Sequence, residues 1–280
     1  MNKEELFYQI KAKNSYLCIG LDSDIDKIPK HLLQEADPIF EFNKQIIDAT
    51  VDYAVAYKPN LAFYESQGAK GWESLSKTMA YLPKNVFTIA DAKRGDIGNS
   101  SNHYARAFFD QLNFDAITLS PYMGYDAIKP YLNYKDKWAI ILALTSNESS
   151  KDFEQLLVIA EGNSLNQQEL KLYEAIIDKS LTWPDNDRIM YVVGATKADE
   201  LVNIRNIIPD HFLLVPGVGA QGGSLEEVSK NGMNNQCGLL VNSSRAIIFA
   251  SQEQDFASAA ASKAGLMQAE MKEYLEKYCI

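Results

Sequence analysis

The sequence lacks an excess of basic residues, a long apolar run and a leader-like start. Its 27 Lys and Arg residues against 37 Asp and Glu residues give a formal net charge of −10. Nucleic acids and anionic membranes select basic surfaces, so neither is expected as the main partner. No stretch reaches the roughly 18 apolar residues of a membrane-spanning helix. The first ten residues include acidic side chains where a signal peptide has basic ones, which predicts a cytoplasmic protein.

Cysteine and histidine are also scarce, with three of each in 280 residues. Cys18, Cys237 and Cys279 show no CxxC or Cys/His ligand spacing, and an odd number of cysteines cannot all pair within one chain. The histidines are scattered, without an HExxH or similar pair. These absences argue against a disulfide framework and a histidine-based metal site, and they favour a reducing compartment.

What the sequence does contain is a series of short apolar runs separated by helical patterns. The runs have the β-branched and aromatic content of strands that are buried on both faces. Eight such runs are present, at 16–20, 53–57, 86–90, 116–119, 138–144, 189–193, 212–215 and 239–241.

Helix start signals lie between these runs. Asp37 is an N-cap candidate followed by Pro38 at the first helical position, and apolar residues then recur at helical spacing. The segment 166–169, Asn-Gln-Gln-Glu, matches a capping box and predicts a helix directly after it. Further helices are expected over 199–208, near 226–228 and over 257–278.

Eight strands that alternate with helices favour parallel pairing through right-handed crossovers, and eight strands close a (β/α)8 barrel. The predicted fold is therefore an α/β TIM barrel, a single domain over residues 1–280. A doubly wound open sheet is the structural alternative. The segment 147–188 is longer than an ordinary strand-to-helix connection, so it is expected to be an insertion that acts as a lid or faces a dimer partner.

The charged end of the third apolar run is the first candidate site. Asp91 and Lys93 are two positions apart and project from the same face of an extended chain. Gly95 allows the backbone to turn before Asp96. Lys58 ends the second run, which lies beside the third in a barrel, so it would extend this series of alternating charges.

Carboxylates on both sides favour the ammonium form of Lys93. The side chain is then a cation or proton donor, and Schiff-base chemistry, which needs a neutral amine, is disfavoured. The alternative is an ion network that only closes the mouth of the barrel.

A glycine loop follows the seventh run. Gly217, Gly219 and Gly222 form a literal GxGxxG. A dinucleotide fingerprint would need an acidic residue about twenty positions further on, where this chain has 239–242, Leu-Leu-Val-Asn. A phosphate site is favoured instead, because glycines let backbone amides approach phosphate oxygens.

Arg245 and Gln221 fit this phosphate interpretation. Arg245 follows the eighth run, which neighbours the seventh in a closed barrel, and loops after these two strands often bind phosphate. Arginine supplies a fixed charged fork for oxygens, and Gln221 donates through its amide. For Arg245 alone, the alternative is a surface arginine near a helix start.

Together these segments resemble the orotidine 5'-phosphate decarboxylase family, in particular its longer bacterial branch. The Asp-x-Lys-x-x-Asp element alone is shared with related sugar-phosphate enzymes, whereas the whole ordered set is specific. The matching segments are Gly20-Leu-Asp22, Tyr57-Lys-Pro-Asn60, Ala62-Phe-Tyr64, Asp91-Ala-Lys-Arg-Gly-Asp-Ile-Gly98, Ser120-Pro-Tyr-Met-Gly124, Leu144-Thr-Ser-Asn147, Val193-Gly-Ala-Thr196, Pro216-Gly-Val-Gly-Ala-Gln-Gly-Gly223 and Ser244-Arg245.

The resemblance implies a lyase that converts orotidine 5'-phosphate to uridine 5'-phosphate in de novo pyrimidine biosynthesis. Lys93 would protonate C6 of the pyrimidine after carbon dioxide leaves, and Lys58, Asp91 and Asp96 would complete the charged array. The resemblance also implies a homodimer in which Asp96 reaches into the partner's site.

Substrate contacts are implied as well. The residues concerned are Asp22 and Ser100 for the ribose, Ser146 for the pyrimidine, and Gln221 and Arg245 for the phosphate. The chain departs from the family pattern at two places. Ser100 stands where threonine is usual and keeps the hydroxyl, and Asn147-Glu-Ser-Ser replaces Asn-Pro-Gly, which leaves the loop after Ser146 undefined.

The array suits this reaction, because loss of carbon dioxide leaves a C6 carbanion without an adjacent π-system, and a fixed ammonium is the stabiliser to expect. Asp91 would also repel the departing carboxylate. No metal and no organic cofactor are expected. Two alternatives remain: a metal-dependent sugar-phosphate decarboxylase or aldolase with the same core, and a non-catalytic nucleotide-binding barrel.

Overall fold

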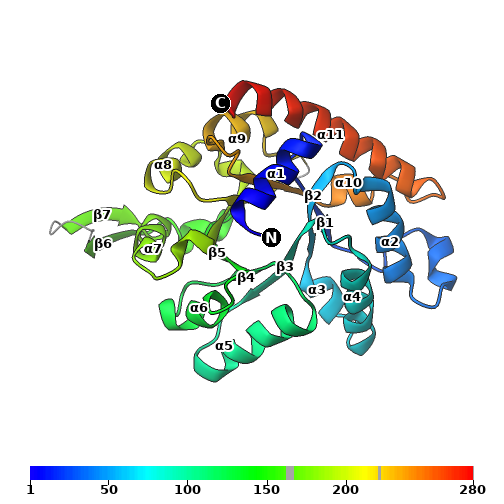
Figure 1. The fold of residues 1–280 in the computed structure, drawn as a ribbon, viewed down its shortest axis with the longest axis horizontal. Helices are drawn as coiled ribbons and strands as arrows, with labels where there is room; N and C mark the ends of the chain where they lie inside the picture. The colour runs from blue at the N-terminus through cyan, green and yellow to red at the C-terminus, as the bar shows by residue number, and fades with distance from the viewer. Residues whose placement is uncertain (162–166, 220–221, 280) are drawn as a thin grey trace.

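Eight strands close into a barrel at the centre of the fold (Figure 1). The computed structural model describes residues 1–161, 167–219 and 222–279. Neighbouring strands are parallel throughout, in the order β1-β10-β9-β8-β5-β4-β3-β2. The barrel strands are β1 (Leu17–Leu21), β2 (Ala54–Pro59), β3 (Phe87–Arg94), β4 (Ala116–Leu119), β5 (Trp138–Leu144), β8 (Ile189–Val193), β9 (Leu213–Pro216) and β10 (Leu239–Ser243).

Each of the eight apolar runs coincides with one barrel strand, so the predicted (β/α)8 barrel is confirmed. The barrel closes where β1 pairs with β10, for example at Leu17 opposite Val241. That pairing excludes the doubly wound open sheet, whose edge strands do not meet. The strands are almost entirely buried, as expected when helices cover a parallel sheet whose other face lines the barrel interior.

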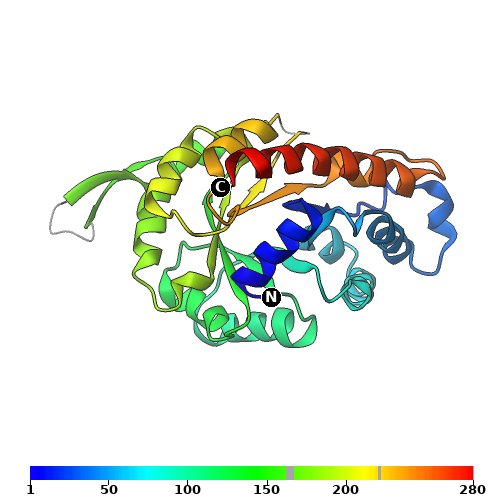
Figure 2. The same ribbon diagram turned by 45° about the horizontal axis from the view of Figure 1, so that its top comes forward.

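Helices surround the barrel. They are α1 (Lys3–Lys13), α2 (Pro38–Thr50), α3 (Leu61–Glu65), α4 (Ala69–Tyr81), α5 (Gly98–Ala105), α6 (Tyr125–Leu132), α7 (Leu172–Leu181), α8 (Glu200–Ile207), α9 (Leu225–Gly232), α10 (Arg245–Ile248) and α11 (Phe256–Tyr278). The predicted cap of α2 is present, because the Asp37 carboxylate accepts the Phe40 N–H. The closing helix α11 packs along α2 and α10 (Figure 2). In the described part of the chain, no helix has both the length and the apolar character of a membrane crossing.

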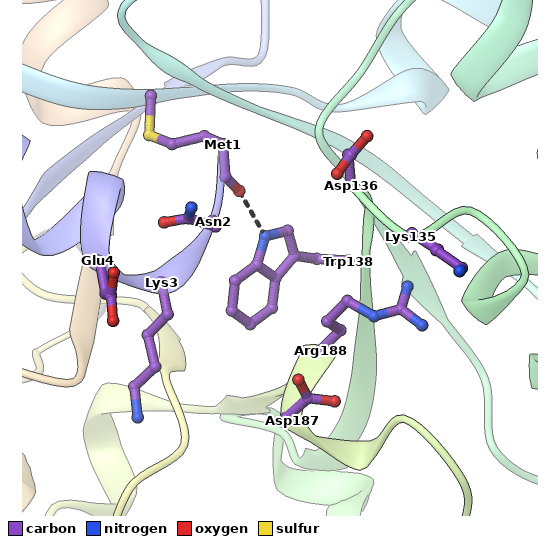
Figure 3. Close-up of a pocket in the computed structure, with 9 residues that line it drawn as sticks. All are labelled: Met1, Asn2, Lys3, Glu4, Lys135, Asp136, Trp138, Asp187 and Arg188. Carbon is purple, nitrogen blue, oxygen red and sulfur yellow. Dashed lines mark hydrogen bonds between the residues drawn. The ribbon is translucent and has the colours of Figure 1, made fainter.

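Helix α1 lies across the amino ends of the strands, in front of the barrel in Figure 1. A cavity of about 390 Å³ lies beside it, and Figure 3 shows its lining. Trp138 donates its indole N–H to the Met1 carbonyl at 2.8 Å. Arg188 donates to the carbonyls of Leu132 and Tyr134 at 2.7 and 2.6 Å. The Trp138 and Arg188 side chains at this end of the barrel are therefore hydrogen-bonded to backbone carbonyls.

The segment 147–188 contains a hairpin that projects from the barrel in both ribbon views (Figures 1 and 2). The short helix η3 (Glu148–Asp152) leads into the antiparallel strands β6 (Leu157–Glu161) and β7 (Gln167–Lys171). The helix predicted after residues 166–169 is present as α7, but its predicted start at a capping box there is wrong. Residues 167–169 pair with β6, and α7 begins only at Leu172, because strand pairing overrides the local helix signal. Asn166 lies outside the described residues.

Candidate active site

Three of the predicted charged residues meet at the carboxyl ends of β2 and β3. Lys58 Nζ lies 2.6 Å from Asp91 Oδ2, and Lys93 Nζ lies 2.5 Å from Asp91 Oδ1. The Asp91 carboxylate thus bridges two ammonium groups. The side chains of Lys58 and Asp91 are only 5% and 9% exposed, whereas that of Lys93 is 51% exposed. Lys93 is therefore the most solvent-exposed member of the array, although Lys58 and Asp91, and not Lys93, line the adjacent cleft.

The buried pair is fixed in its charged form. Burial alone would raise the pKa of Asp91, but the charges and hydrogen bonds of Lys58 and Lys93 outweigh burial and hold that pKa below its ordinary value. Burial alone would likewise lower the pKa of Lys58, but Asp91 and then Asp22 outweigh it and raise that pKa above its ordinary value. Lys58 and Asp91 therefore supply a fixed pair of opposite charges at neutral pH.

Lys93 has a left-handed backbone, with φ of +46°, at the end of a strand. This conformation is costly for a residue with a Cβ and is typical of functional positions. The Lys93 N–H donates to Thr118 Oγ1 at 2.9 Å, and the Thr118 hydroxyl donates to Asp91 at 3.1 Å. Thr118 on β4 therefore supports both groups. The sequence analysis missed it, although a polar residue inside the apolar run 116–119 was an available signal.

Gly95 directly follows the end of β3, where it was predicted to let the backbone turn, and it is not among the residues with positive φ. The left-handed backbone of this segment lies at Lys93. Gly95 also matters for packing. A Cβ there would lie 3.2 Å from both Met123 Cε and Ser120 Cβ, so glycine permits close packing against the segment after β4.

A cleft of about 320 Å³ opens beside the array, within the size range of small-molecule sites. Four predicted site residues line it: Asp22, Lys58, Asp91 and Arg245. Gly217 of the predicted phosphate loop also lines it. The lining residues that were not predicted as site residues are Lys27, Asn60, Phe63, Pro216, Val218, Asn242, Ser243 and Ser244. The cleft thus runs from the charged array on β2 and β3, past β1, to the ends of β9 and β10.

Two buried acceptor atoms in the cleft have no hydrogen-bond partner among the described residues: Asp22 Oδ1 and Asn242 Oδ1. Asp22 directly follows β1, and Asn242 lies on β10. These two strands are neighbours in the barrel, where Cys18 pairs with Asn242. Buried polar atoms are nearly always hydrogen-bonded, so two unpaired acceptors in one cleft make it a candidate site for a ligand with hydrogen-bond donors. Asn242 was missed, although it is the polar residue that ends the eighth apolar run.

The far end of the cleft is suited to an anion. Arg245 is exposed at the start of α10 and makes no ion pair within the described ranges. Gly217 and Gly219 have φ of +100° and +77°, and Gly222 has +87°, conformations that residues with a Cβ rarely adopt. The predicted phosphate ligand Gln221 lies outside the described residues.

Asp96 and Ser100 do not join the array of their own chain. Asp96 accepts the Ile97 N–H at 2.7 Å, and no ion pair connects it to Lys93 in the described part of the chain. Ser100 is exposed near the start of α5. Apolar neighbours are also exposed here, since Ile97 is 57% and Tyr122 91% exposed. Within one chain the series of contacts runs from Lys58 through Asp91 to Lys93. The prediction that Asp96 enters the site of a partner subunit stays a prediction.

Ser146 follows β5 and does not line the cleft as the structure presents it. Its backbone packs tightly against Gly194 at the end of β8. A Cβ on Gly194 would lie 2.7 Å from Ser146 N and 2.8 Å from Ser146 Cα. Glycine at this position therefore fixes how closely the loop after β5 approaches β8.

Comparison with known proteins gives consistent matches over nearly the whole chain. A family described as "Orotidine 5'-phosphate decarboxylase / HUMPS family" matches residues 15–260. The orotidine 5'-phosphate decarboxylase of Parabacteroides distasonis is 58% identical over 278 residues, 98% of this chain and 96% of that protein. That of Phocaeicola vulgatus is 55% identical over 98% of this chain and 99% of its own length. The solved structure of Leishmania donovani OMP decarboxylase superposes with a TM-score of 0.79 at 35% identity, covering 96% of this chain and 100% of that one.

Proposed function

The chain belongs to the orotidine 5'-phosphate decarboxylase family, and from this premise we propose that it converts orotidine 5'-phosphate to uridine 5'-phosphate in de novo pyrimidine biosynthesis. The proposal rests on one observation above all, the Asp91 carboxylate held between Lys58 and Lys93 beside a cleft. Relatives of this name match across their full length, which favours this reaction over a metal-dependent sugar-phosphate reaction.

Substrate binding follows the length of the cleft. Arg245 and the glycine loop bind the phosphate through charge and backbone amides. The unpaired oxygens of Asp22 and Asn242 accept hydrogen bonds from the ribose hydroxyls. With the phosphate and ribose held in this way, the pyrimidine lies toward Lys93, and Ser146 contacts it from the loop after β5. Binding energy from the remote phosphate thereby positions C6 at the array.

In the chemical step, the bond between C6 and the carboxylate carbon breaks and its electron pair remains on C6. The Lys93 ammonium stabilises this charge and then donates its proton to C6, which yields uridine 5'-phosphate and carbon dioxide. Lys93 regains a proton from solvent, to which it is half exposed. Lys58 holds Asp91 in place, and Asp91 aims Lys93 and faces the departing carboxylate.

The working form is a homodimer in which Asp96 enters the partner's site. Two observations support this: Asp96 is absent from its own chain's array, and Ile97 and Tyr122 expose apolar surface beside it. Mixing the inactive variants Asp96→Ala and Lys93→Ala tests the arrangement. Subunit exchange should restore up to about a quarter of wild-type activity, because half of the dimers are mixed and each has one intact site. No recovery, with subunit exchange verified, would contradict it.

A cytoplasmic location completes the proposal. Its support is the cysteine content, since Cys18, Cys237 and Cys279 are all free thiols and two of them are buried. Thiols persist in reducing compartments.

The decisive experiment is turnover. Purified protein is incubated with orotidine 5'-phosphate and a chelator, and loss of the orotate absorbance is followed. Turnover with chelator present supports the proposal. No turnover would refute it. A requirement for magnesium with indifference to the pyrimidine would favour the sugar-phosphate reaction, and tight uridine 5'-phosphate binding without turnover would favour a non-catalytic barrel.

A further inference from the structure

The loop after β5 is held by a carboxylate from the insertion. Glu154 Oε2 accepts the Thr145 N–H at 2.7 Å, and Glu154 Oε1 accepts the Thr145 hydroxyl at 2.8 Å. Both oxygens of one carboxylate therefore accept hydrogen bonds from Thr145, the residue that directly precedes Ser146. Hydrogen bonds to a charged acceptor are about twice as strong as those between neutral groups.

The same contact sets the residue after Ser146. Thr145 Oγ1 also donates to Asn147 Oδ1 at 2.5 Å. A hydroxyl has one proton, so Thr145 shares it between the Asn147 and Glu154 oxygens, and the hydroxyl links these two side chains. Glu154 thus fixes the residues on both sides of Ser146, while Gly194 limits the loop from behind.

Glu154 itself is anchored by the base of the hairpin. Its backbone carbonyl accepts the Tyr173 N–H at 2.9 Å, and the Leu156 carbonyl accepts the Leu172 N–H at 2.8 Å. Both donors belong to the start of α7, which packs on the barrel. Within the described ranges, Glu154 makes no ion pair, so its charge is satisfied by the Thr145 donors and solvent.

We propose that Glu154 is a positioning residue, which holds the Thr145-Ser146-Asn147 loop in the conformation that recognises the pyrimidine. This inference rests on the proposed function, in which Ser146 contacts the pyrimidine. Glu154 acts through Thr145 and touches no substrate atom. Its loss lets the loop relax, and the cost falls on the base end of the ligand and not on the phosphate end.

The binding of two ligands, the product and its ribose phosphate part, distinguishes an effect at the base end from one at the phosphate end. Calorimetry with uridine 5'-phosphate reports the whole cleft, and calorimetry with ribose 5-phosphate reports the ribose and phosphate contacts only. Glu154→Ala should weaken uridine 5'-phosphate binding by about tenfold, the effect of losing a hydrogen bond to a charged group, and leave ribose 5-phosphate binding unchanged. Glu154→Gln keeps one acceptor for Thr145 and should restore part of the loss.

The matched control is Asp152→Asn, which removes a carboxylate two residues away that is exposed on η3. It should bind both ligands as the wild type does. A Glu154→Ala variant that binds both ligands equally less well, or neither less well, would overturn the inference. Circular dichroism and thermal unfolding of each variant show whether the protein is folded, and the Glu154→Gln variant provides the test if Glu154→Ala is not.

A double-mutant cycle tests the route through Ser146. If Glu154 acts by placing Ser146, then Ser146→Ala combined with Glu154→Ala should bind uridine 5'-phosphate no more weakly than Ser146→Ala alone. Additive losses would contradict that route. Failure of the proposed function looks different, because the wild type would then neither turn over orotidine 5'-phosphate nor prefer uridine 5'-phosphate to ribose 5-phosphate.

Discussion

The two ends of the barrel have cavities of similar size, about 390 Å³ at the amino end and about 320 Å³ at the carboxyl end. Charged side chains line both. At the amino end, Arg188 donates to three backbone carbonyls, and the Trp138 indole N–H donates to the Met1 carbonyl. At the carboxyl end, Asp22 Oδ1 and Asn242 Oδ1 are buried without a described partner.

Cavity size therefore does not distinguish the two ends. Among the described residues that line the two cavities, the buried side-chain atoms without a partner, Asp22 Oδ1 and Asn242 Oδ1, lie at the carboxyl end. A buried acceptor without a partner costs folding free energy, about 1–3 kcal/mol for each neutral group. Such atoms persist where a ligand pairs with them. The amino end should therefore determine stability, and the carboxyl end should determine binding and turnover. Substitutions at each end test this division.

The largest expected effect is on turnover at the carboxyl end. Lys93→Ala removes the proton donor and should lower kcat by at least about 10,000-fold. The fold should remain, because Asp91 keeps its 2.6 Å contact with Lys58. Single-turnover assays and thermal unfolding measure both quantities. Lys84→Ala removes an exposed lysine before β3 as a control. A normal rate in Lys93→Ala would refute the proton-donor role.

The opposite result is expected at the amino end. Trp138 is 3% exposed and donates to Met1, so Trp138→Ala should cost about 3–5 kcal/mol in the free energy of unfolding. Activity per folded molecule should be unchanged, as measured below the unfolding transition. Trp72→Ala on α4, where the side chain is 37% exposed, should cost clearly less. A loss of kcat in folded Trp138→Ala would break the division between the two ends.

The phosphate end of the cleft should affect binding more than chemistry. Arg245→Ala removes the exposed charge that follows β10 and should raise KM about 100-fold, the worth of a charge-assisted pair with phosphate. Lys230→Ala removes the same charge from an exposed position on α9 and serves as the control. If both variants raise KM equally, the general positive field binds the phosphate, and Arg245 has no specific contact.

The sequence predicted the barrel well because its evidence is periodic and repeated. Buried parallel strands are continuous apolar runs, and each of the eight was recognisable by itself. The meeting of Lys58 with Asp91 also followed, because neighbouring strands end at the same rim. Strand order in a barrel is fixed by the chain, so these contacts needed no further information.

The features of the fold and the site that were not predicted depend on contacts that no local sequence pattern encodes. Residues 167–169 form a strand despite their capping-box pattern, because β6 supplies pairing partners from outside that segment. The left-handed backbone at Lys93 depends on Thr118 from β4. Glu154 reaches Thr145 only because η3 reverses the chain between them. Each of these features depends on a specific contact with a residue outside the motif, which spacing within the motif does not specify.

The smallest expected effect concerns the pH dependence of stability. Burial, with the nearby cations Lys3 and Arg205, lowers the pKa of His211 below its ordinary value of 6.5 against the opposing effect of Asp210 and the hydrogen bond to Asn186. The folded state then binds fewer protons than the unfolded state. Stability is complete above the unfolded pKa and falls as the pH drops from there toward the folded pKa. Asp91, whose pKa is lowered from 3.8, contributes only in stronger acid.

The unfolding temperature of the wild type should therefore fall between about pH 7.5 and about pH 5.5, around the histidine pKa. His211→Gln removes the titrating ring at the amino end and should flatten this slope, although it can lower stability at every pH. His31→Gln, at an exposed position, should leave the slope unchanged. An unaltered slope in His211→Gln would mean that another group causes the pH dependence of stability near neutral pH. The assignment of stability to the amino end would then rest on groups that do not titrate, such as Trp138. The hydrogen bond from Trp138 to Met1 persists at any pH in this range.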